Sequence, residues 1–354
     1  MNLTNIYPQG TKALILAHEC LGTSNGKTAH GIMQYGEIFS IQGVVDRSKA
    51  GLKVGEVIPR LDKAAQVPVY SSVQEALEQE EAQVLLLGVA LPGGVLPESW
   101  REELKGALIR GLDIISGLHL FLSEDPEFKE LAAEKGCRIT DLRRPPDKLQ
   151  VSSLGVRKTS GKVVLTMGTD CVIGKRTAAS VLYQQAKELG KNPAFLATGQ
   201  TGLMLGCDEG AVIDRIPADF VSGQVEKMVL DLHKRGKEII FVEGQGALLH
   251  PCYAGVTLSL LHGADPQAVV LIHDPERLQR DGFEDDKMDI PGWQIERELI
   301  EKLSRAKVVG LGTWGEQKKA ILAKEADIPV FDLTKQEEAG ALINLLDQFF
   351  KGGK

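Results

Sequence analysis

The sequence predicts an α/β protein of two domains, an N-terminal Rossmann-like parallel sheet followed by a C-terminal P-loop NTPase-like parallel sheet. Its 354 residues exceed the usual size of one domain and fit two. In both halves, short and nearly continuous apolar runs alternate with longer amphipathic stretches, which is the pattern of parallel strands covered by helices on both faces. A stretch rich in proline and glycine separates the halves. We therefore predict domains over residues 1–145 and 162–354, joined by a linker at 146–161.

The N-terminal half begins with an apolar run that fits a buried strand, and further runs of this kind follow it. Strands are predicted over residues 13–18, 40–46, 83–90, 113–116 and 137–142. Stretches with helical spacing of apolar residues lie between the later runs. Helices are predicted over residues 72–79, 98–110 and 126–135. This order is that of a Rossmann-like half.

The C-terminal half repeats the alternation after the linker. Strands are predicted over residues 163–167, 194–198, 238–243, 268–274, 307–311 and 329–333. Helices are predicted over residues 174–189, 219–235, 294–306 and 336–350. A second parallel sheet with helices on its faces is therefore expected.

The composition bounds the classes of function. A hydrophobic share of 43% with 25% charged residues is ordinary for a globular protein. The net charge of -7 argues against a protein that binds nucleic acid or an anionic membrane through an extended surface. The most apolar window, residues 84–96, is broken by Pro92 and two glycines and is too short to span a bilayer. We expect a small-molecule substrate, a homo-oligomer, and no nucleic-acid or membrane partner.

Cysteine usage and the N-terminus indicate a cytoplasmic protein. The five cysteines are scattered and form no Cys-x-x-Cys pair, so they fit reduced thiols better than a disulfide framework or a zinc site. The first residues show no basic region followed by an apolar run, so no secretory signal is visible. No metal site is predicted.

The strongest functional signal is an apolar strand that runs into a loop bracketed by glycines and then into a helix, over residues 163–189. This order is that of a phosphate-binding loop, in which backbone N–H groups and a helix N-terminus face the anion and a lysine adds a full charge. The predicted phosphate-binding residues are Gly168, Thr169, Asp170, Gly174, Lys175, Arg176 and Thr177. A polyphosphate is the expected ligand, and a glycine-rich turn before an ordinary helix is the alternative.

Two departures from the common P-loop pattern bear on the ligand. Five residues separate Gly168 from Gly174, which is one more than in the common pattern. Arg176 follows the lysine at the position where Ser or Thr normally binds Mg²⁺. Because a guanidinium supplies charge and hydrogen bonds to a phosphate by itself, the loop predicts an anion that needs no magnesium ion.

A second signal lies at residues 239–247, where an apolar strand ends in a carboxylate and glycines follow. The carboxyl ends of parallel strands line the ligand crevice, which places Glu243 near the phosphate-binding loop. Glu243 could accept a proton or hold a metal, or its carboxylate could cap loop N–H groups. His250 follows near the same edge and suits general-base work on an amine, with a structural role as the alternative.

Polar side chains after two strand ends are candidates for holding a small polar substrate. The predicted substrate-binding residues are Thr198, Gln200, Thr201 and Gln245. The loop at residues 198–202 can also be an ordinary glycine turn. Asp208 follows this loop and, in an ATP-dependent enzyme, could join Glu243 in holding Mg²⁺.

The first domain has a glycine-containing loop of its own at residues 22–29. Asp46 ends the next strand 20 residues past Gly26, where Rossmann domains place a ribose-binding acid. The glycines do not spell the dinucleotide motif, so a substrate-binding or purely structural loop stays open beside dinucleotide binding.

With these segments in view, the chain resembles the D-glutamate N-acetyltransferase-like family over nearly its whole length. That family has a Rossmann-like N-terminal half and a P-loop C-terminal half. The matching stretches are residues 168–177, 198–202, 243–251 and 256–263. The resemblance implies acetyl-CoA as the donor and the amino group of an acidic D-amino acid as the acceptor. The phosphates of CoA are not hydrolysed in such a transfer, which agrees with Lys175 and Arg176 in a loop without a magnesium ligand.

The C-terminal half is also similar to dethiobiotin synthetase-like P-loop proteins, in its Gly-Thr-Asp start and its Val-Glu-Gly strand end. Three functions therefore stay open. The first is an N-acetyltransferase in which the P-loop holds CoA phosphates and Glu243 or His250 takes a proton from the attacking ammonium group. The second is a ligase or phosphotransferase that uses ATP with magnesium. The third is a nucleotide-dependent switch or assembly protein that turns over no small molecule.

Overall fold

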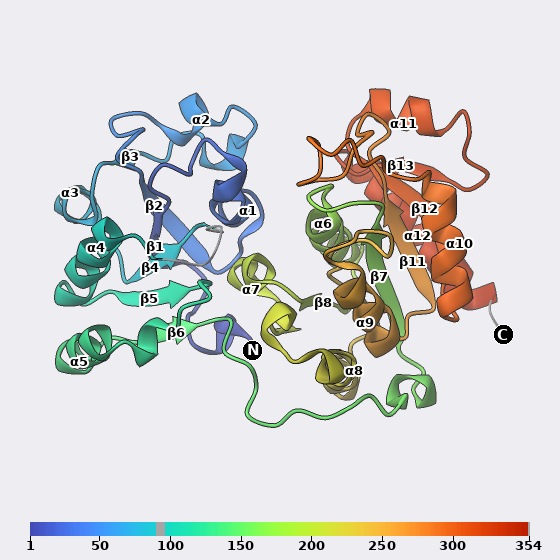
Figure 1. The fold of residues 1–354 in the computed structure, drawn as a ribbon, viewed down its shortest axis with the longest axis horizontal. Helices are drawn as coiled ribbons and strands as arrows, with labels where there is room; N and C mark the ends of the chain where they lie inside the picture. Colours follow the sequence, from blue (N-terminus) through green and yellow to red (C-terminus); the bar gives the residue numbers. More distant parts are fainter. Residues whose placement is uncertain (90–95, 353–354) are drawn as a thin grey trace. The chain divides into compact units, whose positions relative to one another are not determined.

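The computed structural model describes residues 1–89 and 96–352 (Figure 1). The chain forms two compact units. Unit 1 contains Met1–Pro145 together with Gln200–Cys207, and unit 2 contains Pro146–Gly199 together with Asp208–Lys354. Each unit is built on one parallel sheet, so the predicted fold class is confirmed.

Unit 1 is built on a six-stranded parallel sheet in the order β3-β2-β1-β4-β5-β6, which is the order of a Rossmann fold. Its strands are β1 (Thr11–Leu16), β2 (Phe39–Val45), β3 (Val69–Tyr70), β4 (Val84–Leu87), β5 (Asp113–Ser116) and β6 (Ile139–Asp141). Successive residues of β1 and β4, such as Leu14, Ile15 and Leu86, are fully buried. The sheet is therefore covered on both faces, as a parallel sheet requires.

Helices with clear terminal signals cover this sheet. They are α1 (Lys27–Tyr35), α2 (Val54–Val57), α3 (Val73–Gln79), α4 (Glu98–Ile109), α5 (Pro126–Lys135) and α7 (Gln200–Gly206). At the start of α3, the hydroxyl of Ser72 accepts the N–H of Glu75 at 3.1 Å. Asp125 caps α5 ahead of Pro126, and Gly136 ends that helix with a φ of +69°. Although α7 lies late in the sequence, it packs against α1 within unit 1.

Unit 2 is built on a seven-stranded parallel sheet in the order β13-β12-β11-β7-β10-β8-β9. Its strands are β7 (Lys162–Gly168), β8 (Pro193–Ala197), β9 (Glu209–Gly210), β10 (Ile239–Val242), β11 (Ala268–Ile272), β12 (Lys307–Thr313) and β13 (Val330–Asp332). Its helices are α6 (Lys175–Glu188), α8 (Ala218–Lys234), α9 (Ala254–Ala264), α10 (Trp293–Leu303), α11 (Glu316–Leu322) and α12 (Gln336–Gly352).

The central strand β7 divides the core of unit 2 into two layers. Val163, Leu165 and Met167 belong to a buried cluster that includes side chains of α8, α9 and α10. Because successive side chains of a strand point to opposite faces, Val164 and Thr166 face the other layer. There, α6 and α12 pack against each other. Burial on both faces fixes the end of β7, from which the phosphate-binding loop departs.

Every strand and helix that the sequence predicted is present, with ends that differ by a few residues, and residue 90 of one predicted strand lies outside the described residues. Several elements were not predicted. The strands β3 and β9 contain two residues each, which is too short to show a pattern. α9 is apolar nearly all round and so lacks the spacing that marks an amphipathic helix. α1 and α7 begin within glycine-containing segments that favour turns.

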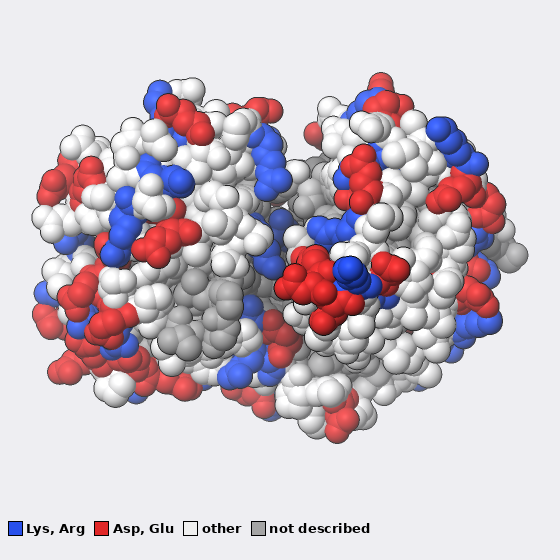
Figure 2. Space-filling view, turned by 45° about the horizontal axis from the view of Figure 1, so that its top comes forward, with Lys and Arg blue, Asp and Glu red and all other residues white. Residues whose placement is uncertain are grey.

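The surface and the cysteines agree with the composition. Acidic and basic side chains are intermixed over the face drawn in Figure 2. None of the five cysteines, all of which lie in the described ranges, forms a disulfide. Within residues 1–89 and 96–352, no helix is both long enough and apolar enough to cross a membrane. Part of the apolar window at residues 84–96 lies outside these ranges. The homo-oligomer and the cytoplasmic location stay predictions.

Candidate functional site

The candidate site lies at the carboxyl ends of the central strands of unit 2, where the strand order reverses. β7 pairs with β10 on one side and with β11 on the other. The chain leaves β7 into the predicted phosphate-binding loop, leaves β10 at Glu243 and leaves β11 at His273. Open α/β sheets bind their ligands at such a switch point.

The loop between β7 and α6 has the backbone of an anion cradle. Gly174 precedes α6 with a φ of +98°, and Val172 also has a positive φ. A side chain at Gly174 would collide with the indole of Trp314, whose Nε1 donates to the carbonyl of Ile173 at 2.8 Å. The loop is thereby held over the N-terminus of α6, where unpaired N–H groups and the helix dipole favour an anion.

Lys175 is the first residue of α6, and its side chain points into this loop. The side chain is only 6% exposed, and Nζ donates to the carbonyl of Asp170. Burial lowers the pKa of Lys175, while nearby Cys171, Asp170 and Glu296 oppose that shift. Lys175 therefore places a buried amino group inside the cradle, and its contact with a phosphate stays a prediction.

The donor set around the loop fits an anion bound by cations better than one bound through magnesium. Arg176 occupies the position of the usual magnesium ligand. Its positive charge favours the ionised carboxylate of Glu243 and so opposes the rise in the pKa of that group. The carboxylate of Asp208 accepts the N–H of Phe195, in the middle of β8, at 2.9 Å and pairs with Lys237 at 2.8 Å. Asp208 is therefore engaged away from the loop, and the ATP-dependent alternative lacks one of its two expected magnesium ligands.

Other predicted loop residues have structural partners. Thr169 Oγ1 lies 2.8 Å from Nδ1 of His273 at the end of β11, and burial lowers the pKa of that histidine. A side chain at Gly168 would press against Ile173 and the stem of Lys175. Thr177, in the first turn of α6, is partly exposed.

Asp170 is fully buried beneath the segment that joins β11 to α10. Its Oδ2 accepts the N–H of Asp281 at 2.9 Å and faces Nη1 of Arg277 at 3.3 Å. Arg277 also donates to the carbonyl of Cys171 at 2.8 Å. The second oxygen, Oδ1, is buried without a hydrogen-bond partner among the residues that the structure describes. Since buried polar atoms are nearly always paired, this oxygen marks the site as one that can receive a further group.

His250 is buried beside the same loop and is oriented by its neighbours. Its ring packs on Tyr253, with ring centroids 4.8 Å apart. Nδ1 accepts the N–H of Cys252 at 3.2 Å, which places the proton of the neutral ring on Nε2. Nε2 lies 3.4 Å from the carbonyl of Asp281 and 3.8 Å from Oδ1 of Asp170. In this tautomer His250 donates through Nε2.

Asp170, Cys171 and His250 present atoms of metal-ligand type within 4.8 Å of one another. A metal ion at this place would bind the lone pair of Nε2. Because Nδ1 accepts the N–H of Cys252, the proton of the neutral ring lies on Nε2, and that nitrogen has no lone pair to offer. Arg277 stands beside the carboxylate and would repel a metal ion. The arrangement therefore favours a hydrogen-bond network over a metal site.

Glu243 ends β10 with a buried carboxylate. Its Oε2 accepts the N–H groups of Thr198 at 2.8 Å and Gly199 at 3.1 Å. Burial raises the pKa of Glu243, while the charge of Arg176 and these N–H groups oppose the shift. Gln245 Nε2 donates to the carbonyl of Thr198 at 2.7 Å. Glu243 thus caps the loop after β8, and a raised pKa also suits a group that exchanges a proton.

Two of the predicted substrate-binding residues lie in unit 1. Gln200 Nε2 donates to Thr28 Oγ1 at 3.1 Å and to the carbonyl of Val89 at 3.0 Å. Arg143 Nη2 donates to Oε1 of Gln200 at 3.3 Å. Thr201 Oγ1 lies 2.9 Å from Thr28 Oγ1. These bonds engage the polar groups of both residues, so they anchor α7 within unit 1.

Several residues of the site were missed by the sequence reasoning. Glu296 occupies a buried position of α10, and its Oε1 accepts the N–H of Leu248 at 2.5 Å. Burial raises the pKa of Glu296 to about 7. Arg280 is buried as well. The available signal was an acid on the apolar stripe of α10, between Trp293 and Ile300.

The corresponding loop of unit 1 is held together by Asp46. Its Oδ1 accepts the N–H groups of Glu19 at 2.9 Å and Ser48 at 3.0 Å. Its Oδ2 accepts the N–H of Leu21 at 3.1 Å. Because both oxygens bind the loop of their own unit, Asp46 has a structural role, and dinucleotide binding loses the residue that suggested it.

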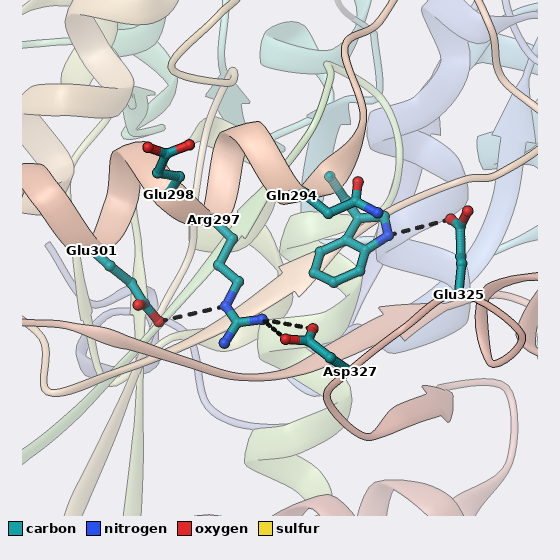
Figure 3. Close-up of a pocket in the computed structure, with 7 residues that line it drawn as sticks. Gln294, Arg297, Glu298, Glu301, Glu325 and Asp327 are labelled. Carbon is teal, nitrogen blue, oxygen red and sulfur yellow. Dashed lines mark hydrogen bonds and ion pairs between the residues drawn. The ribbon is translucent and has the colours of Figure 1, made fainter.

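A pocket of about 390 Å³ lies against α10 (Figure 3). It is lined by Trp293, Gln294, Arg297, Glu298, Glu301, Glu325 and Asp327. Figure 3 shows Arg297 turned toward Asp327, and Nη1 of Arg297 donates to Oδ1 of Asp327 at 2.7 Å. Nε1 of Trp293 donates to Oε1 of Glu325 at 3.3 Å. These polar groups satisfy one another, and none of the predicted site residues lines the pocket. It is therefore not part of the candidate site.

Family comparisons match both halves of the chain. Residues 150–342 match "Domain of unknown function (DUF1611_C) P-loop domain". Residues 47–145 match "Domain of unknown function (DUF1611_N) Rossmann-like domain". The Rossmann-like half and the P-loop half that the sequence predicted are confirmed, and so is the resemblance to this family.

Individual relatives extend these matches. A curated D-glutamate N-acetyltransferase of Tritonibacter scottomollicae is 33% identical over 278 residues, which cover 75% of this chain and 81% of the relative. A second protein of that name, from a Pseudoalteromonas species, is 38% identical over 202 residues, covering 57% of this chain and 59% of the relative. The crystal structure of a DUF1611 family protein from Anabaena variabilis ATCC 29413 is 33% identical with a TM-score of 0.87. That match covers 96% of this chain and all of the other.

Proposed function

Because the chain belongs to the DUF1611 family, we propose that it is an N-acetyltransferase that moves the acetyl group of acetyl-CoA to the amino group of an acidic D-amino acid such as D-glutamate. The chain is an enzyme of the acyltransferase class, as the names of its two curated relatives indicate. The observation that carries the finer proposal is a phosphate-binding loop with Lys175 buried inside it and Arg176 in place of a magnesium ligand.

In this proposal the loop after β7 holds the phosphates of CoA. The N-terminus of α6 supplies N–H groups, and Lys175 and Arg176 supply charge. Acetyl transfer leaves the phosphates of CoA intact, so the site needs positive charge there and no metal-activated nucleophile. Gly168 and Gly174 keep the loop in this conformation, because a side chain at either position would collide with Ile173, Lys175 or Trp314.

The chemistry requires a neutral amine at the acetyl thioester. A base takes one proton from the ammonium group, the new N–C bond forms, the C–S bond breaks, and CoA leaves as a thiol. Glu243, with its raised pKa, is the proposed proton acceptor. His250 donates a hydrogen bond through Nε2 and would stabilise the oxyanion, while the second proton of the attacking nitrogen passes to the leaving thiolate. Since both residues flank the loop that binds the phosphates, the pantetheine arm has to fold back toward this edge.

The test is thiol release from acetyl-CoA by the purified protein across a panel of D- and L-amino acids. We expect release that depends on an acidic D-amino acid and is lost in Lys175→Ala. Consumption of Mg-ATP is followed in parallel with the same panel. ATP consumption without thiol release would overturn the proposal in favour of a ligase or phosphotransferase.

A second variant separates the two anions. Replacing Arg176 with threonine restores the usual magnesium ligand of a P-loop. If the loop binds CoA, Arg176→Thr weakens CoA binding in calorimetry and leaves Mg-ATP binding unchanged or improved. The opposite outcome, weaker Mg-ATP binding with CoA unaffected, would contradict the assignment of the loop to CoA.

A further inference from the structure

Three buried side chains beside the phosphate-binding loop each carry a polar atom without a hydrogen-bond partner in the part of the chain that the structure describes. These atoms are Oδ1 of Asp170, Nη1 of Arg280 and Oε2 of Glu296. Each side chain is at least nine-tenths buried. They come from three separate places, namely the loop after β7, the segment between β11 and α10, and α10 itself. An unpaired buried polar atom is costly, so a bound group is expected to complete this set.

Contacts place Asp170 and Glu296 beside one turn, residues 248–250, and they place the backbone next to Arg280 there as well. Glu296 Oε1 accepts the N–H of Leu248 at 2.5 Å. Asp170 Oδ1 lies 3.8 Å from Nε2 of His250. Asp281, which follows Arg280, donates its N–H to Oδ2 of Asp170 at 2.9 Å. The carbonyl oxygen of Asp281 lies 3.4 Å from Nε2 of His250. The charge of Arg280 also acts on the carboxyl group of Glu296. The three side chains therefore lie in one region of unit 2, beside this turn.

The chemistry of the unpaired atoms is that of an amino-acid site. Two carboxylate oxygens accept hydrogen bonds from an ammonium group, and a guanidinium N–H donates to a carboxylate. We propose that Asp170 and Glu296 bind the ammonium group of the amino-acid acceptor and that Arg280 binds its carboxylate. This proposal rests on the proposed acetyltransferase function and names the residues that hold its acceptor. A phosphate at the same place would face two carboxyl groups, so an anion alone does not fit.

The position suits the transfer. The charges of Asp170 and Glu296 both act on Lys175, so an ammonium group held by these two carboxyl groups would lie next to the phosphate-binding loop. Lys175 also acts on Glu243, the proposed proton acceptor. The three unpaired atoms are buried, so entry of the acceptor would require residues 273–292 to move away from the loop. Arg277 and the N–H of Asp281 fasten that segment to Asp170 and would close it again over the bound acceptor.

The test is the KM of D-glutamate and of acetyl-CoA in the full-length protein and in Asp170→Asn, Arg280→Lys and Glu296→Gln. Losing one charged hydrogen bond raises the KM of D-glutamate about tenfold or more, and leaves that of acetyl-CoA within about twofold. Glu298→Gln is the matched control, because Glu298 lies on α10 but is exposed and pairs with Lys302. An unchanged KM for D-glutamate in the three variants, or an increase confined to acetyl-CoA, would overturn the site.

A measurement on the unmodified protein protects the test against variants that do not fold. D-2-hydroxyglutarate keeps both carboxylates of D-glutamate and replaces the ammonium with a hydroxyl group. If Asp170 and Glu296 bind the ammonium, D-glutamate binds in calorimetry and the hydroxy acid does not; equal binding would refute the assignment. Binding of D-glutamate without any thiol release would leave this site standing while the acetyltransferase proposal fails.

Discussion

Each unit opens its first long helix with the dipeptide Gly-Lys, and the two lysines have opposite surroundings. In unit 1, Gly26 and Lys27 lead into α1, and Lys27 is exposed to solvent. In unit 2, Gly174 and Lys175 lead into α6, and Lys175 is buried with Nζ against a carbonyl of its own loop. Gly26 has a φ of -79°, whereas Gly174 has a φ of +98°. The same dipeptide thus gives a surface cation in one unit and a cation aimed into a loop in the other.

The polar groups around the two loops differ in the same way. In unit 1, Asp46 uses both carboxylate oxygens on backbone N–H groups, and His18 Nδ1 accepts the N–H of Arg47 at 3.1 Å. In unit 2, Asp170 and Glu296 each keep one buried oxygen without a partner among the described residues. A loop whose polar groups satisfy one another is structural, and one that leaves buried polar atoms unpaired is built for a ligand. Neither the order of the strands nor the Gly-Lys dipeptide distinguishes the structural loop of unit 1 from the candidate ligand-binding loop of unit 2.

The largest expected effect tests the two lysines against each other. Lys175→Ala removes the buried cation of the cradle and should lower kcat/KM for acetyl-CoA by about 100-fold or more, which is about 3 kcal/mol. Lys27→Ala removes an exposed cation from the equivalent position and should stay within about twofold of the unmodified protein. Steady-state thiol release measures both. Equal losses in the two variants would break the comparison.

The pH dependence of stability sharpens the comparison at Glu296. Burial raises the pKa of this carboxyl group from its ordinary 4.5 to about 7, so the native state keeps a proton that the unfolded chain releases between these values. The contribution of Glu296 to the free energy of unfolding is full below pH 4.5 and is lost as pH rises through 7, by about 3 kcal/mol. Urea unfolding across this window measures it in the unmodified protein and in Glu296→Gln. The free energy of unfolding of Glu296→Gln should lack this part of the pH dependence. Parallel curves of unfolding free energy against pH for the two proteins would contradict the raised pKa.

A pair of aspartates separates a structural carboxylate from a functional one. Asp46→Asn removes acceptors of buried N–H groups and should lower the free energy of unfolding by about 2 kcal/mol, with no change in the KM of D-glutamate. Asp170→Asn should change that KM and cost less stability, because one of its two oxygens has no partner to lose. Denaturant unfolding and steady-state kinetics on both variants provide the comparison. A KM effect at Asp46 would show that unit 1 takes part in substrate binding.

The sequence predicted both sheets and the phosphate-binding loop because those features depend on local order. The strand, the glycines and the lysine of the loop are contiguous, so their arrangement could be inferred without knowing the fold. Glu296 and Arg280 could not be found in this way, since they lie more than 100 residues after the loop and join it only through packing. Nothing in the sequence of residues 200–207 indicated that this segment packs with the first domain and not with the second. Its place in unit 1 becomes visible only in contacts such as those of Gln200 with Thr28 and Val89.

The smallest expected effect concerns the residue that follows Glu296. Arg297 turns to the pocket of Figure 3 and pairs with Asp327, which is 70% exposed. Because exposed ion pairs contribute little, Arg297→Ala should lower the free energy of unfolding by less than about 1 kcal/mol and leave thiol release unchanged. Glu296→Gln, one residue away on the buried side of α10, should change the KM of D-glutamate. A change in the kinetics of Arg297→Ala comparable to that in Glu296→Gln would contradict this expectation. Paired charges would then not indicate a structural role here, and the pocket of Figure 3 would have to be included in the candidate site.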